Sequence, residues 1–131
     1  MKLILIIKLL ILTSLFISCN MDSAQKNFDN NYDELFELVR KLKDLDDIFV
    51  DLRDPDTIIN NNEIANILRN TNTLYLRKRS DNLTVIGYKQ NINITIAYYF
   101  FDDDIEYRRV RSILSACRKS KFYRGIVICE L

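Results

Sequence analysis

Three consecutive segments between residues 73 and 101 show the alternation of apolar and polar residues that is typical of β-strands. The third segment, residues 92–101, places five apolar side chains on one face: Ile92, Ile94, Ile96, Tyr98 and Phe100. Three residues separate 73–79 from 83–89, and two residues separate 83–89 from 92–101. Connections this short suit antiparallel hairpins, since parallel strands need a long crossover. We therefore predict an antiparallel meander of three strands.

The segments around this meander predict three helices and a fourth strand. Apolar residues recur at helical spacing in residues 30–43, 61–69 and 104–120. Residues 122–131 are apolar on both faces, which indicates a strand that is covered on both sides. The order α-α-β-β-β-α-β predicts an α+β fold, in which a mainly antiparallel sheet, the meander plus the C-terminal strand, has helices packed on one face.

Local signals add expectations about the ends of elements. Asn60 and Glu63 have the spacing of a capping box, in which two side chains satisfy the first backbone N–H groups of a helix. Asp102, Asp103 and Asp104 place negative charge where the N-terminus of the helix 104–120 favours it. We therefore expect helices to begin close to residues 61 and 104.

The segment 44–56 is rich in aspartate. Within it, Ile48-Phe49-Val50 predicts a short edge strand or a buried turn, and Pro55 is expected to end any regular element. An EF-hand calcium loop needs a central glycine and a closing glutamate, and this segment contains no glycine. We interpret its carboxylates as those of a solvated linker and expect no metal site; the alternative is a looser calcium site.

The first 19 residues have the organisation of an export signal. Lys2 and Lys8 flank a short apolar run, a longer apolar run follows, and the small residue Ser18 precedes Cys19. The sequence Phe16-Ile17-Ser18-Cys19 resembles the lipobox of bacterial lipoproteins, with Phe16 where the strict motif has leucine. The resemblance covers residues 1–19 only. The alternative is an ordinary secretory signal that ends near a cysteine.

The lipoprotein resemblance implies how the chain is processed and where the protein is located, and it leads us to divide the chain into three parts. A signal peptide, residues 1–18, is removed, and Cys19 carries a diacylglyceryl thioether and an acylated amino group, with chains such as palmitate. We expect residues 19–29 to form a flexible polar tether and residues 30–131 to form one small domain. The lipid anchor places the domain on a membrane of a bacterial cell envelope. Asn20 favours the outer membrane or cell surface over the inner membrane.

The residue types present exclude several chemistries. The chain has no histidine, which excludes Ser-His-Asp and Cys-His catalysis and the zinc sites that need histidine. Gly87 and Gly125 are its two glycines, so it has no glycine-rich phosphate loop. Carboxylate catalysis by Asp102–Asp104 and Glu106 remains, but clustered acids are more often a solvated helix cap. We predict a non-enzymatic protein with no cofactor and no small-molecule substrate.

Two cysteines besides Cys19 occur near the C-terminus. Cys117 lies on the apolar side of the helix predicted for residues 104–120, and Cys129 lies on the strand that follows. Export would place both in a compartment where disulfides persist. If helix and strand pack together, their Cα atoms come close enough for a bridge. Free cysteine is also a common buried apolar residue, so we predict proximity and leave the alternatives of bond and free thiols open.

Charge is distributed unevenly along the chain. Removing Lys2 and Lys8 leaves 17 basic against 18 acidic residues, a net charge of −1 that does not favour nucleic acid. Residues 19–72 carry a net charge of −6, and residues 73–131 carry +5. Basic and aromatic residues concentrate in the last helix and just after it, and the following are candidates for partner binding: Tyr107, Arg108, Arg109, Arg111, Arg118, Lys119 and Tyr123.

These candidates lead to two functional hypotheses. Surfaces that mix arginine and tyrosine are frequent anchors of protein contacts. The first hypothesis is therefore an envelope lipoprotein whose domain binds another protein, for example as an inhibitor or immunity protein. The second is a structural or accessory lipoprotein whose basic C-terminal face binds anionic polymers or lipid headgroups. The same side chains would also fit an ordinary solvated helix face.

Overall fold

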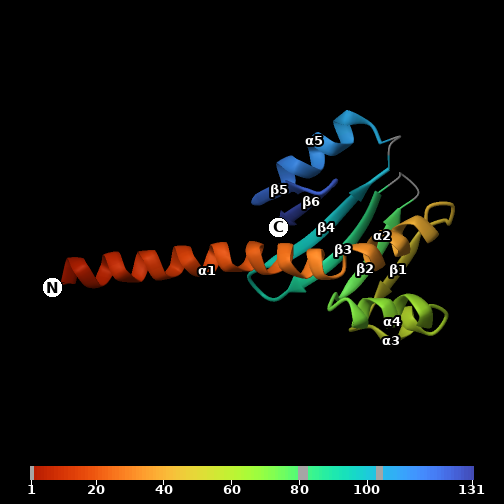
Figure 1. Cartoon of the computed structure of the whole chain (residues 1–131), viewed down its shortest axis with the longest axis horizontal. Helices are drawn as coiled ribbons and strands as arrows, with labels where there is room; N and C mark the ends of the chain where they lie inside the picture. Colours follow the sequence, from red (N-terminus) through yellow and green to blue (C-terminus); the bar gives the residue numbers. More distant parts are fainter. Residues whose placement is uncertain (1, 80–82, 103–104) are drawn as a thin grey trace.

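A six-stranded antiparallel sheet forms the centre of the molecule (Figure 1). The computed structural model describes residues 2–79, 83–102 and 105–131, without the side chains of residues 3 and 9–20. The sheet order is β1-β2-β3-β4-β6-β5, and every neighbouring pair is antiparallel. The strands are β1 (Ile48–Asp51), β2 (Tyr75–Arg79), β3 (Leu83–Gln90), β4 (Thr95–Phe101), β5 (Lys119–Tyr123) and β6 (Ile126–Glu130). The predicted α+β class with a mainly antiparallel sheet is confirmed.

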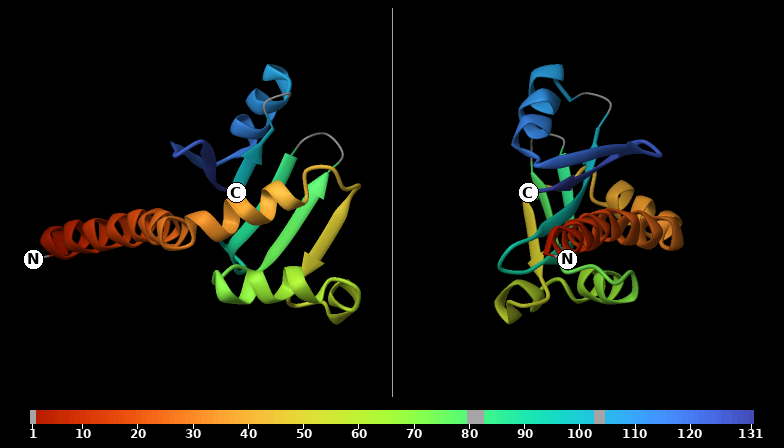
Figure 2. Two further views of the ribbon diagram at one scale, coloured as in Figure 1. Left: turned by 45° about the vertical axis from the view of Figure 1, so that its right-hand side comes forward. Right: turned by 90° about the vertical axis from the view of Figure 1, so that its left-hand side faces the viewer.

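Helices lie on both faces of this sheet. They are α1 (Lys2–Asn30), α2 (Tyr32–Lys41), α3 (Pro55–Ile58), α4 (Asn62–Asn70) and α5 (Tyr107–Ala116). Helices α1, α2 and α4 share one buried core with the strands. The right-hand view of Figure 2 shows α5 on the side of the sheet away from α1 and α2. Helices therefore do not pack on a single face as expected, since α5 covers the face opposite α1 and α2.

The core is built around the second half of α1. Phe28 is fully buried, and its ring contacts five other aromatic rings, those of Tyr32, Phe36, Tyr98, Phe100 and Tyr123, with centroid separations of 5.4–6.2 Å. The Tyr98 hydroxyl donates to the carbonyl oxygen of Ala24 at 2.6 Å and accepts from the Asn27 amide at 3.2 Å. Burial raises the pKa of Tyr98, so this phenol stays neutral and able to donate.

The expected flexible tether of residues 19–29 is wrong. This segment is helical as part of α1, and Ala24, Asn27 and Phe28 within it are buried. The physical reason is an apolar stripe: Met21, Ala24 and Phe28 follow one another at helical spacing and pack against the core. The compact domain therefore includes residues 21–29 and does not begin at residue 30.

The predicted meander is confirmed as β2, β3 and β4, with one change at its second turn. Asn91 accepts hydrogen bonds through Oδ1 from the backbone N–H groups of Asn93 and Ile94, at 3.0 and 2.8 Å. These bonds hold residues 91–94 in a turn, and β4 begins at Thr95. Ile92 lies at the tip of the turn and is fully exposed, so it is not part of the apolar strand face on which we had placed it.

The C-terminal region differs most from expectation. The helix ends at Ala116, and residues 119–130 form a hairpin in place of the end of a helix and one long strand. Arg124 and Gly125 have φ values of 48° and 85°, which suit the two-residue turn of a hairpin. Strand β6 lies between β4 and β5 and all five of its residues are buried, which confirms a strand covered on both faces. Asp103 and Asp104, expected at a helix start, lie outside the described residues, and α5 begins at Tyr107.

Two further expectations about element ends are wrong. Pro55 does not end a regular element but starts α3, because proline fits the first position of a helix and the Asp54 side chain accepts from the Asp56 N–H at 3.1 Å. The capping box of Asn60 and Glu63 is absent, since α4 is preceded by Asn61 without a side-chain cap. Of the two alternatives for Ile48-Phe49-Val50, the edge strand is confirmed.

Candidate functional site

An open cleft lies on the face of the sheet opposite α1, between strands β1–β4 and helix α5. Its volume is about 510 Å³. Fourteen of the described residues line it: Phe49, Asp51, Arg53, Tyr75, Arg77, Arg79, Leu83, Val85, Gln90, Tyr99, Arg109, Ser112, Ile113 and Ala116. We call this the arginine cleft, because its described lining includes four arginines and one carboxylate, that of Asp51.

The pleat of β2 places the basic residues of the cleft. Tyr75, Arg77 and Arg79 alternate with Leu76 and Lys78, so they point away from the core. In the register of the sheet Arg77 lies between Phe49 on β1 and Val85 on β3. The Arg77 guanidinium lies 5.8 Å from the centre of the Phe49 ring, a cation–π distance. Apolar neighbours thus hold the arginine stems while the charged ends face solvent.

One arginine of the cleft is paired with its carboxylate. Arg53 binds Asp51 through two side-chain nitrogens, with N–O distances of 2.7 and 2.9 Å, and through its backbone N–H at 2.9 Å. These bonds lower the pKa of Asp51, mainly through the side-chain hydrogen bond from Arg53. The Arg53 guanidinium also lies 5.9 Å from the Tyr75 ring centre. The pair fixes the rim of the cleft and neutralises one positive charge, while Arg77 and Arg79 keep the described outer face of β2 positive.

Two tyrosines form the floor of the cleft. A Cβ atom on Gly87 would overlap the ring of Tyr75, so glycine is required for this ring to lie flat on β3. Burial is the main cause that raises the pKa of Tyr75 and of Tyr99, although Arg79 lowers that of Tyr99. Both phenols therefore remain protonated at neutral pH and can donate hydrogen bonds to an anionic group.

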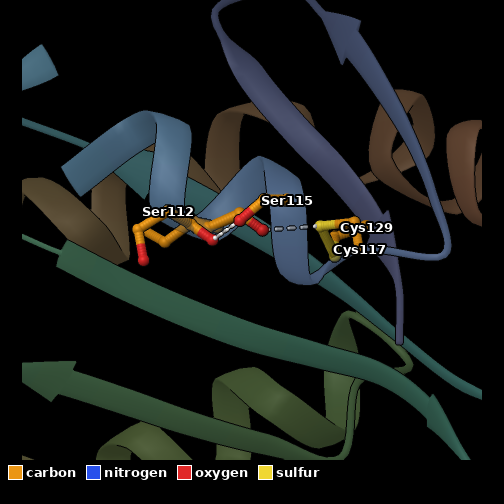
Figure 3. Close-up of a disulfide and its surroundings, with 5 residues drawn as sticks. Ser112, Ser115, Cys117 and Cys129 are labelled. Carbon is orange, nitrogen blue, oxygen red and sulfur yellow. Dashed lines mark hydrogen bonds between the residues drawn. A yellow bond between two sulfur atoms is a disulfide. The ribbon is translucent and has the colours of Figure 1, made fainter. Parts of the chain in front are cut away.

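Helix α5 forms one wall of the cleft and is held by a disulfide. None of the described α5 residues is fully buried, so side-chain packing alone holds this helix only weakly against the sheet. Cys117, directly after α5, is bonded to Cys129 on β6, with a Cα–Cα distance of 5.6 Å. Figure 3 shows this bridge beside the last turn of the helix, where Ser115 donates to the Ser112 carbonyl. The expected proximity is confirmed, and of the two alternatives the structure has the bond.

The structure does not bring the seven candidate partner-binding residues into one surface. Arg109 lines the arginine cleft. Tyr107, Arg108 and Arg111 are exposed on α5, with Arg111 stacked over Tyr107, and Arg118 and Lys119 are exposed at the start of β5. Tyr123 donates to Asp29 of α1 at 2.6 Å, and this bond is the main cause that lowers the pKa of Asp29. Tyr123 therefore joins the β5–β6 hairpin to α1.

The main residues of the cleft were not among the sequence candidates. A signal for them was present, since Tyr75, Arg77 and Arg79 alternate along a strand whose other face is apolar. Arg53 and Asp51 had no such signal, because they flank the end of a four-residue edge strand. Their side chains meet those of β2 only through the pairing of β1 with β2.

The lipidation candidate, Cys19, lies in α1 where this helix leaves the domain. The described side chains of residues 2–8 are exposed, including Ile4 to Ile7 at 49–73%, and Figure 1 shows this part of α1 projecting from the sheet. Among the described residues, no helix is long and apolar enough to cross a bilayer. No cluster of three or more acidic or cysteine side chains that could hold a metal was found in the same residues.

Comparisons with protein-family models, with curated proteins and with solved structures found no match for this chain.

Proposed function

We propose that this chain is a lipid-anchored protein of a bacterial cell envelope, and that its arginine cleft binds an acidic segment of another protein. The observation that carries the proposal is the cleft itself, a concave surface with four arginines, one carboxylate and three aromatic rings. Arginine and tyrosine are the residues that most often dominate binding energy at protein interfaces. The proposed function is non-enzymatic, and its support is the recognition chemistry that the described cleft residues offer.

The chemistry of the cleft favours carboxylate side chains as ligands. A guanidinium donates two parallel hydrogen bonds to a carboxylate, and Arg77 and Arg79 present theirs from adjacent positions on one face of β2. Phe49, Tyr75 and Tyr99 add apolar area beside these charges. A peptide that alternates acidic and apolar side chains would match both features.

Membrane attachment at Cys19 is supported by two independent features. The first is the resemblance of residues 16–19 to a lipobox. The second is the position of Cys19 two residues before Met21, whose side chain packs against the core. Removal of residues 1–18 would therefore take away exposed apolar side chains and leave the described core contacts intact.

Charge reversal in the cleft provides the test. We expect the double variant Arg77→Glu, Arg79→Glu to reduce binding of the partner about tenfold or more, which corresponds to about 1.4 kcal/mol or more. The lipidated protein would be purified, its partners captured from its own envelope, and the affinity for the most abundant captured protein measured by titration. The matched control is Arg108→Glu, Arg111→Glu, which makes the same charge change on exposed positions of α5.

The control separates the two functional hypotheses. Full binding by the α5 variant, with loss in the cleft variant, supports the proposal. Equal loss in both variants, with a ligand that is a polymer or lipid and is released by moderate salt, would instead support a basic C-terminal face that binds anionic envelope polymers or headgroups. Full binding by the cleft variant would contradict the proposed site.

A further inference from the structure

The end of the domain from which α1 projects carries a set of features that suit a lipid surface. This end contains the β3–β4 turn, the start of β5 and the C-terminus, and it faces the viewer in the right-hand view of Figure 2. We propose that the anchored domain rests on the bilayer with this end and that Ile92 inserts among the lipids. The inference rests on the proposed acylation of Cys19, and it adds an orientation that the anchor alone does not define.

The segment between the proposed anchor and the folded domain is very short. Asn20 alone separates Cys19 from Met21, and Met21 packs against the core. Two residues span at most about 7 Å, and here they continue the α1 helix. Acyl chains on Cys19 would therefore enter the bilayer directly beside the folded domain. The end of the domain nearest to Cys19 must then lie against the headgroups.

The β3–β4 turn reaches this same end. Ser23 of α1 and Tyr88 of β3 are joined by a hydrogen bond of 2.9 Å, and from there β3 runs on to the turn in the direction in which α1 leaves the domain (Figure 1). Ile92 at the tip is 101% exposed, the highest value among the described large apolar side chains. The Asn91 bonds fix the turn, so Ile92 is presented without an ordering cost.

Basic groups accompany this apolar tip. The Leu131 N–H donates to the Thr95 carbonyl at 2.8 Å, which places the C-terminus at the base of the turn. Lys119 pairs with Glu130 in the sheet, and Arg118 precedes it, so both exposed cations lie beside the C-terminus. Cations near anionic headgroups favour membrane contact. Asp22 is the exposed carboxylate of α1 closest to Cys19, and this side chain and the carboxylate of the C-terminus oppose the attraction.

A fluorescent label on the lipidated protein tests this orientation. Ile92→Cys would be labelled with an environment-sensitive fluorophore, because Cys19 is acylated and Cys117 and Cys129 are bonded to each other. The control is Ile59→Cys, a 67% exposed position in the α3–α4 connection at the far end of the domain. Both would be reconstituted into vesicles of phosphatidylethanolamine and phosphatidylglycerol, with and without lipids that carry a nitroxide quencher.

We expect emission from position 92 to shift to the blue and to be quenched by the nitroxide lipids, while position 59 retains the emission of a label in water. Water-like emission at both positions, in protein whose mass shows the acyl chains and which floats with the vesicles, would overturn the orientation and leave the anchor standing. Protein without acyl mass, found outside the vesicle fraction, would overturn the anchor and the orientation with it.

Discussion

Replacement of Phe28 by alanine is expected to lower the free energy of unfolding by about 3–5 kcal/mol. Phe28 is fully buried and contacts five aromatic rings from α2, β4 and β5. Those partners come from distant parts of the chain, so the surrounding core cannot close over the missing ring. Urea unfolding of residues 20–131, followed by circular dichroism, would measure the change.

The same measurement on Phe122→Ala provides a matched control. Phe122 is 67% exposed on the edge strand β5, and its loss should change the free energy of unfolding by less than about 0.5 kcal/mol. Similar stabilities for the Phe28→Ala variant and the wild type would show that residues 19–29 are not part of the folded domain. That result would support the prediction that this segment is a flexible tether.

Reduction of the disulfide is expected to lower the free energy of unfolding by about 3 kcal/mol, the value for a closed loop of roughly this length. Cys117 and Cys129 are 12 residues apart in the chain. Reduction should also release α5, since its described side chains are only partly buried, and thereby weaken binding in the arginine cleft. Urea unfolding and partner titration with and without a phosphine reductant would measure both effects.

The variant Cys117→Ala, Cys129→Ala serves as the control for reduction. It should have the stability of the reduced wild type and should not respond to the reductant. Identical unfolding curves for oxidised and reduced wild type would contradict a stabilising role of the bond. Unchanged partner affinity after reduction would show that β6 and the sheet hold α5 in place without it.

The fold could be predicted from the sequence where the local pattern and the tertiary structure agree. The meander 73–101 alternates with period two, and its connections are too short for anything but hairpins. Helix α2 has its apolar residues on one stripe, with Asp33 and Glu34 at its start and Arg40 and Lys41 at its end. Such elements need no information from the rest of the chain.

The remaining differences have tertiary causes. The polar composition of residues 20–29 suggested a tether, but Phe28 inserts between sheet and α2 and makes the segment helical. The edge strand β5 has one apolar residue besides Tyr123, and it forms because the tight turn at Arg124 and Gly125 pairs it with β6. Helix α5 lies on the second face of the sheet. The periodicity of apolar residues predicts a helix but does not indicate which face of a sheet that helix will cover.

The candidate site could be predicted only in part for the same reason. Arg109 and the pair Cys117–Cys129 stood out in the sequence by residue type. The cleft needed the alignment of β1 with β2 and of β2 with β3, which brings Phe49, Arg77 and Val85 side by side. Register is set by long-range pairing, so a grouping of this kind appears only in the folded chain.

The proposed lipid attachment and the observed packing of residues 21–30 would together determine how the domain is placed relative to the membrane. The chain would leave the membrane at Cys19 and enter the core of the domain at Met21. The arginine cleft lies on the face of the sheet opposite α1, and its lining extends along β3 from Leu83 to Gln90. A domain held in this way would keep the cleft accessible from the aqueous side while it remains close to the bilayer.

The most direct test of this account is the intact mass of the mature protein extracted from membranes, compared with that of a Cys19→Ala variant. The account predicts a chain that begins at Cys19 and carries the added mass of a diacylglyceryl group and an amide-linked acyl chain, together with a variant that is neither acylated nor cut before residue 19. An unacylated chain that still contains residues 1–18, or identical maturation of the variant, would contradict it.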